Sequence, residues 1–215
     1  MTLLIETDDG ILARRIQPAR ALSTDVEVGP AAEDATRQAA ATWGLPDFVF
    51  RSIQQASGSG VRELGDAILM AGDLAAVVQV KARTERGQNL QRERSWLDSR
   101  IVKAARQAVG TIRKLGTKPA ITLINERDRG IEIRPAGKTW LSVVVIDHPG
   151  VPDYVPREHA TVLLRRDWDF LFDQLRSTVA VLQYLKRVEG LDPVALGDET
   201  IRYYELVHRD SVAFT

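Results

Sequence analysis

Two apolar segments separated by only three residues constrain the fold of this chain more than any other feature. Residues 61–70 (VRELGDAILM) and 74–82 (LAAVVQVKA) are rich in apolar side chains, and only Ala71, Gly72 and Asp73 join them. So short a connection requires the two segments to pair as an antiparallel hairpin. We therefore predict two neighbouring strands at the centre of a sheet.

The segments around this hairpin alternate between helical and strand patterns. Helix formers followed by Gly and Pro predict a first helix over residues 31–43, and a β-type run predicts a strand over 46–53. The Ser-Gly-Ser-Gly stretch at 57–60 is expected to be a turn. A long helix is predicted over 95–115, because apolar residues recur there at helical spacing: Leu97, Ile101, Ala104, Ala105, Ala108, Val109, Ile112 and Leu115.

Caps and further strands complete the expected architecture. Ser95 should cap the long helix, with Asp98 in its first turn near the positive end of the helix dipole. Residues 120–125 and 140–147 are predicted strands of one mixed, central sheet. The C-terminal part is expected to hold an edge strand at 160–164, a helix over 168–176 capped by Asp167, and helices at 178–190 and 195–208.

Composition places the chain among ordinary globular proteins. Its 215 residues are 44% hydrophobic and 27% charged, which suits one sizeable core, and we expect a single α/β domain over residues 1–215. The absence of cysteine excludes disulfide scaffolds, zinc knuckles and thiol nucleophiles, and makes the cytoplasm the expected compartment. The N-terminus is acidic where a signal peptide is basic, and no apolar run approaches roughly 18 residues, so membrane insertion is not expected.

Charge is balanced overall but unevenly distributed. The chain has 29 basic and 29 acidic residues, yet residues 81–118 hold eleven Lys or Arg against three acids. Residues 1–50 hold four bases against eight acids, and residues 147–215 eight against twelve. This basic segment between two acidic ends is either a solvated face or a surface that binds nucleic acid, and composition alone leaves both open.

Three polar residues interrupt the apolar hairpin. Asp66 lies on its first strand, and Gln79 and Lys81 lie two apart on its second, so their side chains share one face while Val78 and Val80 point to the other. Burying an acid, an amide and an ammonium group is costly unless they pair with each other, a ligand or an ion. The Asp66 carboxylate, the Gln79 side-chain carbonyl and the Val80 main-chain carbonyl are oxygens that suit a partly hydrated Mg²⁺ or Mn²⁺.

Asp66, followed thirteen residues later by Gln79-Val80-Lys81, resembles the D…(D/E)xK signature of PD-(D/E)xK nucleases, the restriction-endonuclease-like superfamily. The family core runs helix, three strands, helix, strand, and the elements expected between residues 31 and 125 follow that order. The resemblance covers roughly residues 31–125, leaves the remainder unassigned, and implies a central mixed sheet flanked by helices. Within the single domain we expect a nuclease-like core over about 31–147 and a C-terminal strand and helical extension over 148–215.

One residue departs from the signature. The usual acid of the second motif is Gln79, a variant found in the Mrr-like branch of the superfamily. A neutral ligand offers less negative charge, so we expect one metal ion and not two. Glu63 is expected to supply an additional acid, and Glu33 in the first helix is a weaker candidate. Gln107 partly matches the glutamine of the Q-x-x-x-Y pattern in RecB-like members, but Thr111 takes the place of the tyrosine.

The resemblance implies a Mg²⁺-dependent or Mn²⁺-dependent nuclease that hydrolyses phosphodiester bonds, in DNA, for restriction, repair or defence; homodimers are common among such nucleases. Asp66, Gln79, Lys81 and Glu63 would be catalytic, with Asp66, Gln79 and Val80 holding the metal. Lys81 would offset developing charge or orient the attacking water. The residues expected to bind the nucleic-acid backbone are Arg83, Lys103, Arg106, Gln107, Arg113 and Lys114, with Arg86, Arg92 and Arg94 from the loop before the helix.

Two other interpretations stay open. The fold can persist without the chemistry, as a nucleic-acid-binding or protein-interaction module in which Gln79 reflects the loss of a catalytic acid. The three polar residues can also have only local roles, with Asp66 in a turn, Gln79 facing solvent on an edge strand and Lys81 extending to solvent at a strand end. No role is assigned to the three histidines, His148, His159 and His208, which are expected at the surface or at strand ends.

Overall fold

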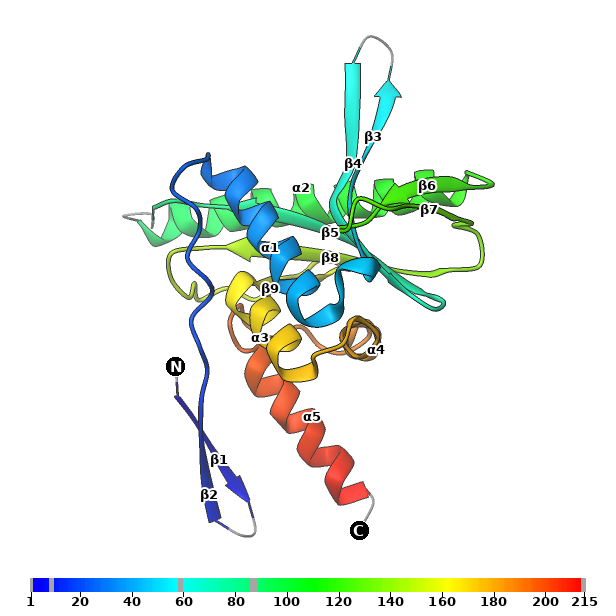
Figure 1. The fold of residues 1–215 in the computed structure, drawn as a ribbon. Helices are drawn as coiled ribbons and strands as arrows, with labels where there is room; N and C mark the ends of the chain where they lie inside the picture. Colours follow the sequence, from blue (N-terminus) through cyan, green and yellow to red (C-terminus); the bar gives the residue numbers. More distant parts are fainter. Residues whose placement is uncertain (1, 8–9, 58–59, 86–88, 214–215) are drawn as a thin grey trace.

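A five-stranded mixed sheet forms the centre of the protein (Figure 1). The computed structural model describes residues 2–7, 10–57, 60–85 and 89–213. The sheet has the order β3-β4-β5-β8-β9, in which the first three strands pair antiparallel and the last three parallel. Its strands are β3 (Val49–Ser57), β4 (Gly60–Ala71), β5 (Leu74–Ala82), β8 (Thr139–Asp147) and β9 (Thr161–Leu164).

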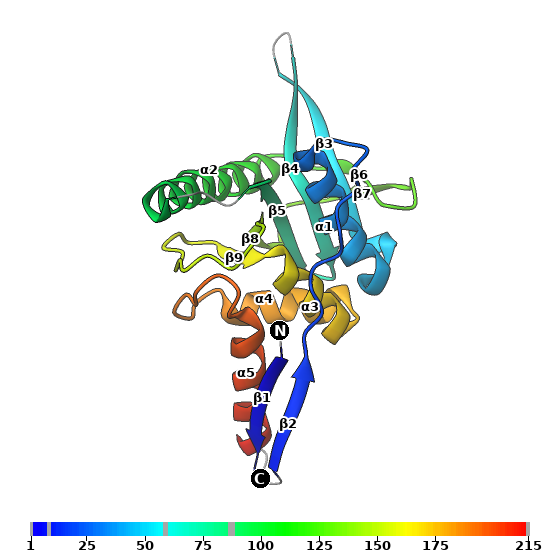
Figure 2. The ribbon, with the colours of Figure 1, turned by 90° about the vertical axis from the view of Figure 1, so that its left-hand side faces the viewer.

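The predicted hairpin is confirmed. β4 and β5 pair antiparallel from Ala71 opposite Leu74 to Ala67 opposite Val78, and they occupy the second and third positions of the sheet. Beyond Ala67, β4 pairs only with β3, and the two strands form an arm that projects from the body (Figures 1 and 2). The turn expected at 57–60 joins these strands, and its residues 58–59 lie outside the described part of the chain.

Helix α2 (Leu90–Gly116) carries the chain from β5 to the parallel strand β8, as a parallel pair requires. The six fully or nearly buried apolar residues of α2 were all among those predicted: Leu97, Ile101, Ala104, Ala105, Ala108 and Leu115. Val109 lies in the helix as predicted, but it is 52% exposed. It follows Ala108 directly, and successive helical residues point about 100° apart, so Val109 lies off the buried stripe.

The predicted start of this helix was also wrong. α2 begins at Leu90, and the Asn89 side chain caps it by accepting a hydrogen bond from the Gln91 N–H group (2.8 Å). Ser95 and Asp98 therefore lie inside the helix, and Glu93 is the acid of its first turn. The first turns extend beyond the main body of the apolar stripe, so apolar periodicity could not reveal them.

Residues 120–125 do not form a strand of the central sheet. β6 (Ile121–Ile124) pairs with β7 (Gly130–Ile133) in a separate two-stranded sheet, and the parallel strand after α2 is β8. This small sheet meets the edge strand β3 through an isolated bridge between Asn125 and Phe50. The prediction failed because a short strand of alternating burial fits an edge hairpin as well as a central sheet.

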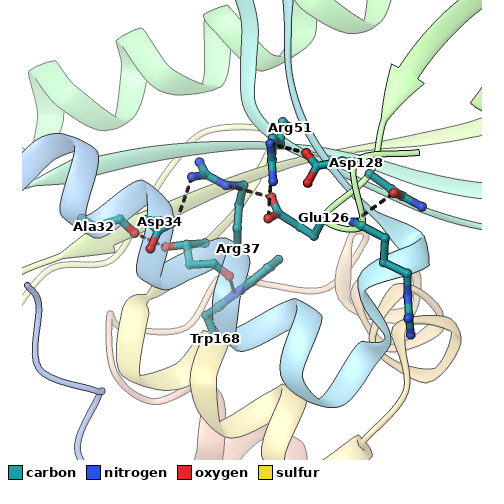
Figure 3. A network of polar contacts seen from close by, with 10 residues as sticks. Ala32, Asp34, Arg37, Arg51, Glu126, Asp128 and Trp168 are labelled. Carbon is teal, nitrogen blue, oxygen red and sulfur yellow. Dashed lines mark hydrogen bonds and ion pairs between the residues drawn. The ribbon is translucent and has the colours of Figure 1, made fainter. Parts of the chain in front are cut away.

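A polar network holds the β6–β7 hairpin against the body (Figure 3). Glu126, two residues after β6, forms ion pairs with Arg37 of helix α1, Val28–Gly44 (3.1 Å), and with Arg51 of β3 (3.6 Å). Arg51 also binds Asp128 (2.9 Å). Because the Glu126 side chain is only 8% exposed, these contacts replace the water it loses on burial.

One face of the sheet packs on α1 (Val28–Gly44), α3 (Arg165–Leu175) and α4 (Thr178–Val188), opposite α2 (Figures 1 and 2). Trp168 and Phe172 of α3 are fully buried in this core, and the Trp168 indole N–H donates to the Thr36 carbonyl (2.9 Å). Asp167 does not cap α3 as predicted, because the helix begins earlier, at Arg165, and Leu164 takes the N-cap position. The edge strand and the helices after it are confirmed, with α5 (Glu199–Ala213) as the last.

The N-terminal hairpin was not predicted. β1 (Thr2–Thr7) and β2 (Gly10–Arg15) pair antiparallel in a small sheet of their own, which extends from the same end of the molecule as α5 (Figure 2). A 3₁₀ turn, η1 (Pro46–Phe48), occupies the start of the strand predicted at 46–53. Within the described residues, none of the helices has the length and apolar character needed to cross a membrane.

Candidate functional site

The three polar residues of the hairpin lie on the face of the sheet that α2 covers. Val78 and Val80 of β5 pack in the core beneath α1, α3 and α4, and the alternation of the strand turns Gln79 and Lys81 the other way. Gln79 is 4% exposed, whereas Asp66 and Lys81 are half-buried. β5 is a central strand, so Gln79 does not face solvent at a sheet edge.

Asp66 takes the place of a main-chain acceptor where β4 separates from β5. The strand ladder ends at the pair Ala67–Val78, and the Asp66 Oδ2 atom accepts a hydrogen bond from the Val80 N–H group (2.6 Å). Gly65, just before Asp66, has a φ of 80°, a left-handed conformation that favours glycine and redirects β4 at this point. The carboxylate is thereby fixed beside β5.

Lys81 contacts two of the oxygens expected to bind a cation. Its ammonium group donates a hydrogen bond to the Val80 carbonyl (2.7 Å) and lies 3.6 Å from Asp66 Oδ2. The side chain is 20% exposed, so it borders open space and does not extend freely into solvent. Lys81 therefore neutralises Asp66 at the position where a metal ion would make its contacts.

The other two oxygens are free of protein donors. Among the described residues, no hydrogen bond reaches the Gln79 amide or the Asp66 Oδ1 atom. Buried polar groups are normally hydrogen-bonded to protein, water or a ligand. Asp66 and Gln79 thus present unused oxygens to the same space.

That space is a groove of about 910 Å³ between the hairpin and α2. Gly65, Asp66, Gln79 and Lys81 form one wall. Along the other wall, α2 contributes the predicted backbone-binding residues Lys103, Arg106, Gln107, Arg113 and Lys114, all exposed. Within the described residues, none of these four cations forms an ion pair, so their charge is available to an anionic ligand.

Other predicted residues lie away from the groove. Arg83 forms an ion pair with Glu93 (3.3 Å) and its guanidinium stacks over the Trp96 ring (5.0 Å), so its charge is already compensated. Glu63 lies in the projecting part of β4, opposite Gln54 of β3, and its side chain is outside the described part of the structure. Arg86 falls outside the described residues altogether.

The remaining candidates have separate surroundings. Arg92 and Arg94 belong to the first turns of α2 and not to a loop, and Arg94 pairs with Asp153 (3.4 Å). Glu33, on α1, is not among the described residues that line the groove. His148 follows β8, as expected for a strand end, but its side chain is fully buried and hydrogen-bonded to Glu93.

The groove also includes residues that we did not predict. They are Gly65 on the hairpin wall and Asp98, Ser99, Val102, Gly110 and Thr111 on α2. Helical spacing from Lys103 would have identified Ser99, Gly110 and Thr111. Asp98 accepts a hydrogen bond from the Tyr154 hydroxyl (2.6 Å), and burial together with this carboxylate raises the pKa of Tyr154 well above its usual value.

The oxygen set fits one hard cation. Asp66 supplies a carboxylate, and Gln79 and Val80 supply neutral carbonyls, which suits a Mg²⁺ or Mn²⁺ that keeps several water ligands. Among the described residues, no group of three His, Asp or Glu side chains could hold a metal. Binding one metal ion requires the Lys81 ammonium to leave the Val80 carbonyl.

Comparison with protein-family models, with curated proteins and with solved structures gave no match. Similarity to known proteins consequently assigns no family, and the function has to be argued from the groove.

Proposed function

We propose that the protein is a cytoplasmic, metal-dependent nuclease that hydrolyses phosphodiester bonds, in DNA. One observation carries the proposal: a single groove holds Asp66, Gln79 and Lys81 opposite four unpaired cations of α2. Carboxylate and carbonyl oxygens suit a cation that binds a phosphate, and the α2 cations suit the flanking phosphates of the same chain. On the opposite face of the sheet, the strands pack against apolar side chains of α1, α3 and α4.

The order of elements supports a restriction-endonuclease-like core. α1, then β3, β4 and β5, then α2 follow the sequence helix, three strands, helix that the resemblance implies. The β6–β7 hairpin comes next, in place of the strand expected at 120–125, and β8 is the strand that then joins the central sheet. Asp66 and Gln79-Val80-Lys81 lie on adjacent central strands, where the signature residues are expected. In this proposal the nuclease-like core ends with β8 at Asp147.

In this proposal, different residues of the groove bind the metal, stabilise the reacting phosphate and contact the nucleic-acid backbone. A Mg²⁺ or Mn²⁺ held by Asp66, Gln79 and Val80 would polarise the scissile phosphate and acidify a bound water. Lys81, once released from the Val80 carbonyl, would offset charge that develops on that phosphate. The cations of α2 contact the backbone, which gives affinity without sequence specificity.

Cleavage of plasmid and linear DNA with Mg²⁺ or Mn²⁺ tests this function. The wild type should cut, whereas the Asp66→Ala and Lys81→Ala variants should remain folded and lose cleavage. Chelation of the metal should stop the wild type as well. A folded wild type that binds DNA and never cuts it, with either metal, would refute the nuclease assignment.

A second candidate function has its own observation. Lys81 already satisfies the charge of Asp66 and occupies the Val80 carbonyl, so the centre is electrostatically complete without a metal. Together with the neutral Gln79, this favours a nucleic-acid-binding module without hydrolysis. DNA binding that is unaffected by Mn²⁺ and by Asp66→Ala would support this alternative.

A further inference from the structure

Gly110 lies in the interior of α2, and close packing against another element does not explain it. Glycine in a helix interior is destabilising relative to alanine, because it loses more backbone freedom on folding. A Cβ atom added at Gly110 would meet nothing within 4 Å. At Gly44 of α1, by contrast, an added Cβ would collide with the Thr178 hydroxyl and the Phe172 ring. Close helix packing therefore explains Gly44 and does not explain Gly110.

Gly110 lies in the groove, between the cations of α2. It lines the groove, seven residues after Lys103 and four after Arg106, with Arg113 and Lys114 three and four residues beyond. Residues at these spacings share one helix face. From Arg106 to Arg113 the helix rises about 10 Å. At Gly110, therefore, no side chain covers the helix backbone between two pairs of unpaired cations.

We propose that a nucleic-acid strand crosses α2 at Gly110, with its phosphodiester backbone against the exposed helix backbone and the cation pairs Lys103/Arg106 and Arg113/Lys114 on its two flanks. This inference rests on the proposed function, since it assumes that the groove binds nucleic acid. Glycine permits the close approach of a ligand backbone that any side chain would obstruct. Cations on both flanks bind phosphates that enter and leave the crossing.

The crossing directs the strand to the opposite wall. Gly110 and the pair Asp66 and Gln79 belong to the same groove, so a strand that passes over α2 at this point continues toward the hairpin. A strand running along α2 would instead place phosphates over both cation pairs in turn and would gain nothing from a missing side chain. Gly110 is therefore a positioning residue, which sets where the strand enters the groove.

A matched pair of glycines in α2 provides the experiment. Gly116, the last residue of the helix, also has nothing within 4 Å of an added Cβ, but it does not line the groove. The variants are Gly110→Leu and Gly116→Leu, with Gly110→Ala and Gly116→Ala as milder changes. The measurements are thermal unfolding and binding of a labelled oligonucleotide, single-stranded and duplex, by fluorescence anisotropy in EDTA.

Gly110→Leu should weaken oligonucleotide binding about tenfold without lowering the unfolding temperature, because leucine suits the helix and fills the crossing. Gly116→Leu should bind like the wild type. Gly110→Ala should raise the unfolding temperature and still bind more weakly than Gly116→Ala. If Gly110→Leu is unstable, the comparison of the two alanine variants tests whether the strand crosses α2 at Gly110.

Equal binding by the Gly110 and Gly116 variants would overturn the crossing, whatever the cleavage result. Plasmid cleavage by the wild type, run in parallel, separates this failure from failure of the proposed function. A wild type that cleaves DNA while Gly110→Leu and Gly110→Ala bind normally refutes only the crossing. A wild type that neither binds the oligonucleotide nor cleaves DNA refutes both.

Discussion

The two faces of the central sheet differ in what covers them and in what they leave open. On one face, apolar side chains of α1, α3 and α4 pack against the valines of β5 and β8, and Trp168 and Phe172 of α3 are fully buried among them. On the other face, a single long helix lies across the sheet and leaves a groove over Asp66, Gln79 and Lys81. Strand β5 contributes to both faces, because successive side chains along a strand point to opposite sides of the sheet.

This difference separates stability from activity within one strand. Val78 and Val80 contribute buried apolar area, whereas Gln79 and Lys81 contribute nothing to that core and are costly to bury without a partner. Substitutions on the packed face should therefore reduce the free energy of unfolding and spare the groove. Substitutions in the groove should weaken DNA binding or metal binding and leave the free energy of unfolding nearly unchanged.

The largest expected effect is on the packed face. Trp168→Ala removes a fully buried indole and its hydrogen bond to Thr36, and should lower the free energy of unfolding by about 3–5 kcal/mol. Urea denaturation followed by circular dichroism measures this loss. DNA affinity per folded molecule should stay unchanged at low temperature. A loss below about 1 kcal/mol would contradict the contrast between the faces.

The next effect concerns the charge of the metal ligands. Gln79→Glu adds a carboxylate beside Asp66 and should tighten Mn²⁺ binding about tenfold, measured by calorimetry. Gln107→Glu is the matched control, because Gln107 lines the same groove on α2. The control should weaken DNA binding through repulsion and leave Mn²⁺ affinity unchanged. If both variants changed Mn²⁺ affinity equally, the ligands would not be those assigned here.

Groove cations should dominate the salt dependence of DNA binding. Removing one phosphate contact, by Lys103→Ala or Arg106→Ala, should reduce the slope of log affinity against log salt by about 0.9 for duplex DNA. Arg94→Ala is the control, since Arg94 pairs with Asp153 and lies outside the groove lining. Anisotropy titrations at several salt concentrations give the slopes. Equal reductions for Arg94 and Lys103 would argue against the groove as the binding surface.

The smallest effect is a pH dependence on the packed side. Burial raises the pKa of Asp167 from 3.8 to about 7, with Glu199 adding to the rise and Arg166 opposing it. A raised carboxyl pKa in the folded state stabilises the fold fully below pH 3.8, and this stabilisation is lost as pH increases to about 7. Asp167→Asn should therefore gain stability relative to the wild type between about pH 4 and 7, with a constant difference above about 8. A stability difference independent of pH would show that Asp167 has an ordinary pKa.

The sequence predicted those features that depend on local pattern. The short connection at Gly72 determined the hairpin, and alternation along β5 determined which side chains accompany Gln79. Helical spacing identified most of the buried face of α2, and the excess of bases in residues 81–118 drew attention to the four cations of this helix that line the groove. These patterns are local, so no knowledge of the tertiary structure was needed.

Features that depend on tertiary contacts were missed. The strand at 121–124 joined a separate hairpin because Asn125 and Glu126 dock at the edge of the central sheet, which no periodicity reveals. The ion pair of Lys81 with Asp66 depends on where β4 leaves β5, next to Gly65. The sequence around Gly110 does not show why a glycine stands inside the helix, because the reason depends on the groove that it lines.

Mn²⁺ binding with and without Asp66 tests the central claim most directly. Calorimetric titration with a DNA oligonucleotide bound should give one Mn²⁺ site per chain in the wild type and none in Asp66→Asn. Lys81→Met should bind Mn²⁺ more tightly than the wild type, because no ammonium group then contacts the Val80 carbonyl and Asp66. Absence of Mn²⁺ binding in the wild type, or binding unchanged by Asp66→Asn, would contradict a metal-dependent centre in this groove.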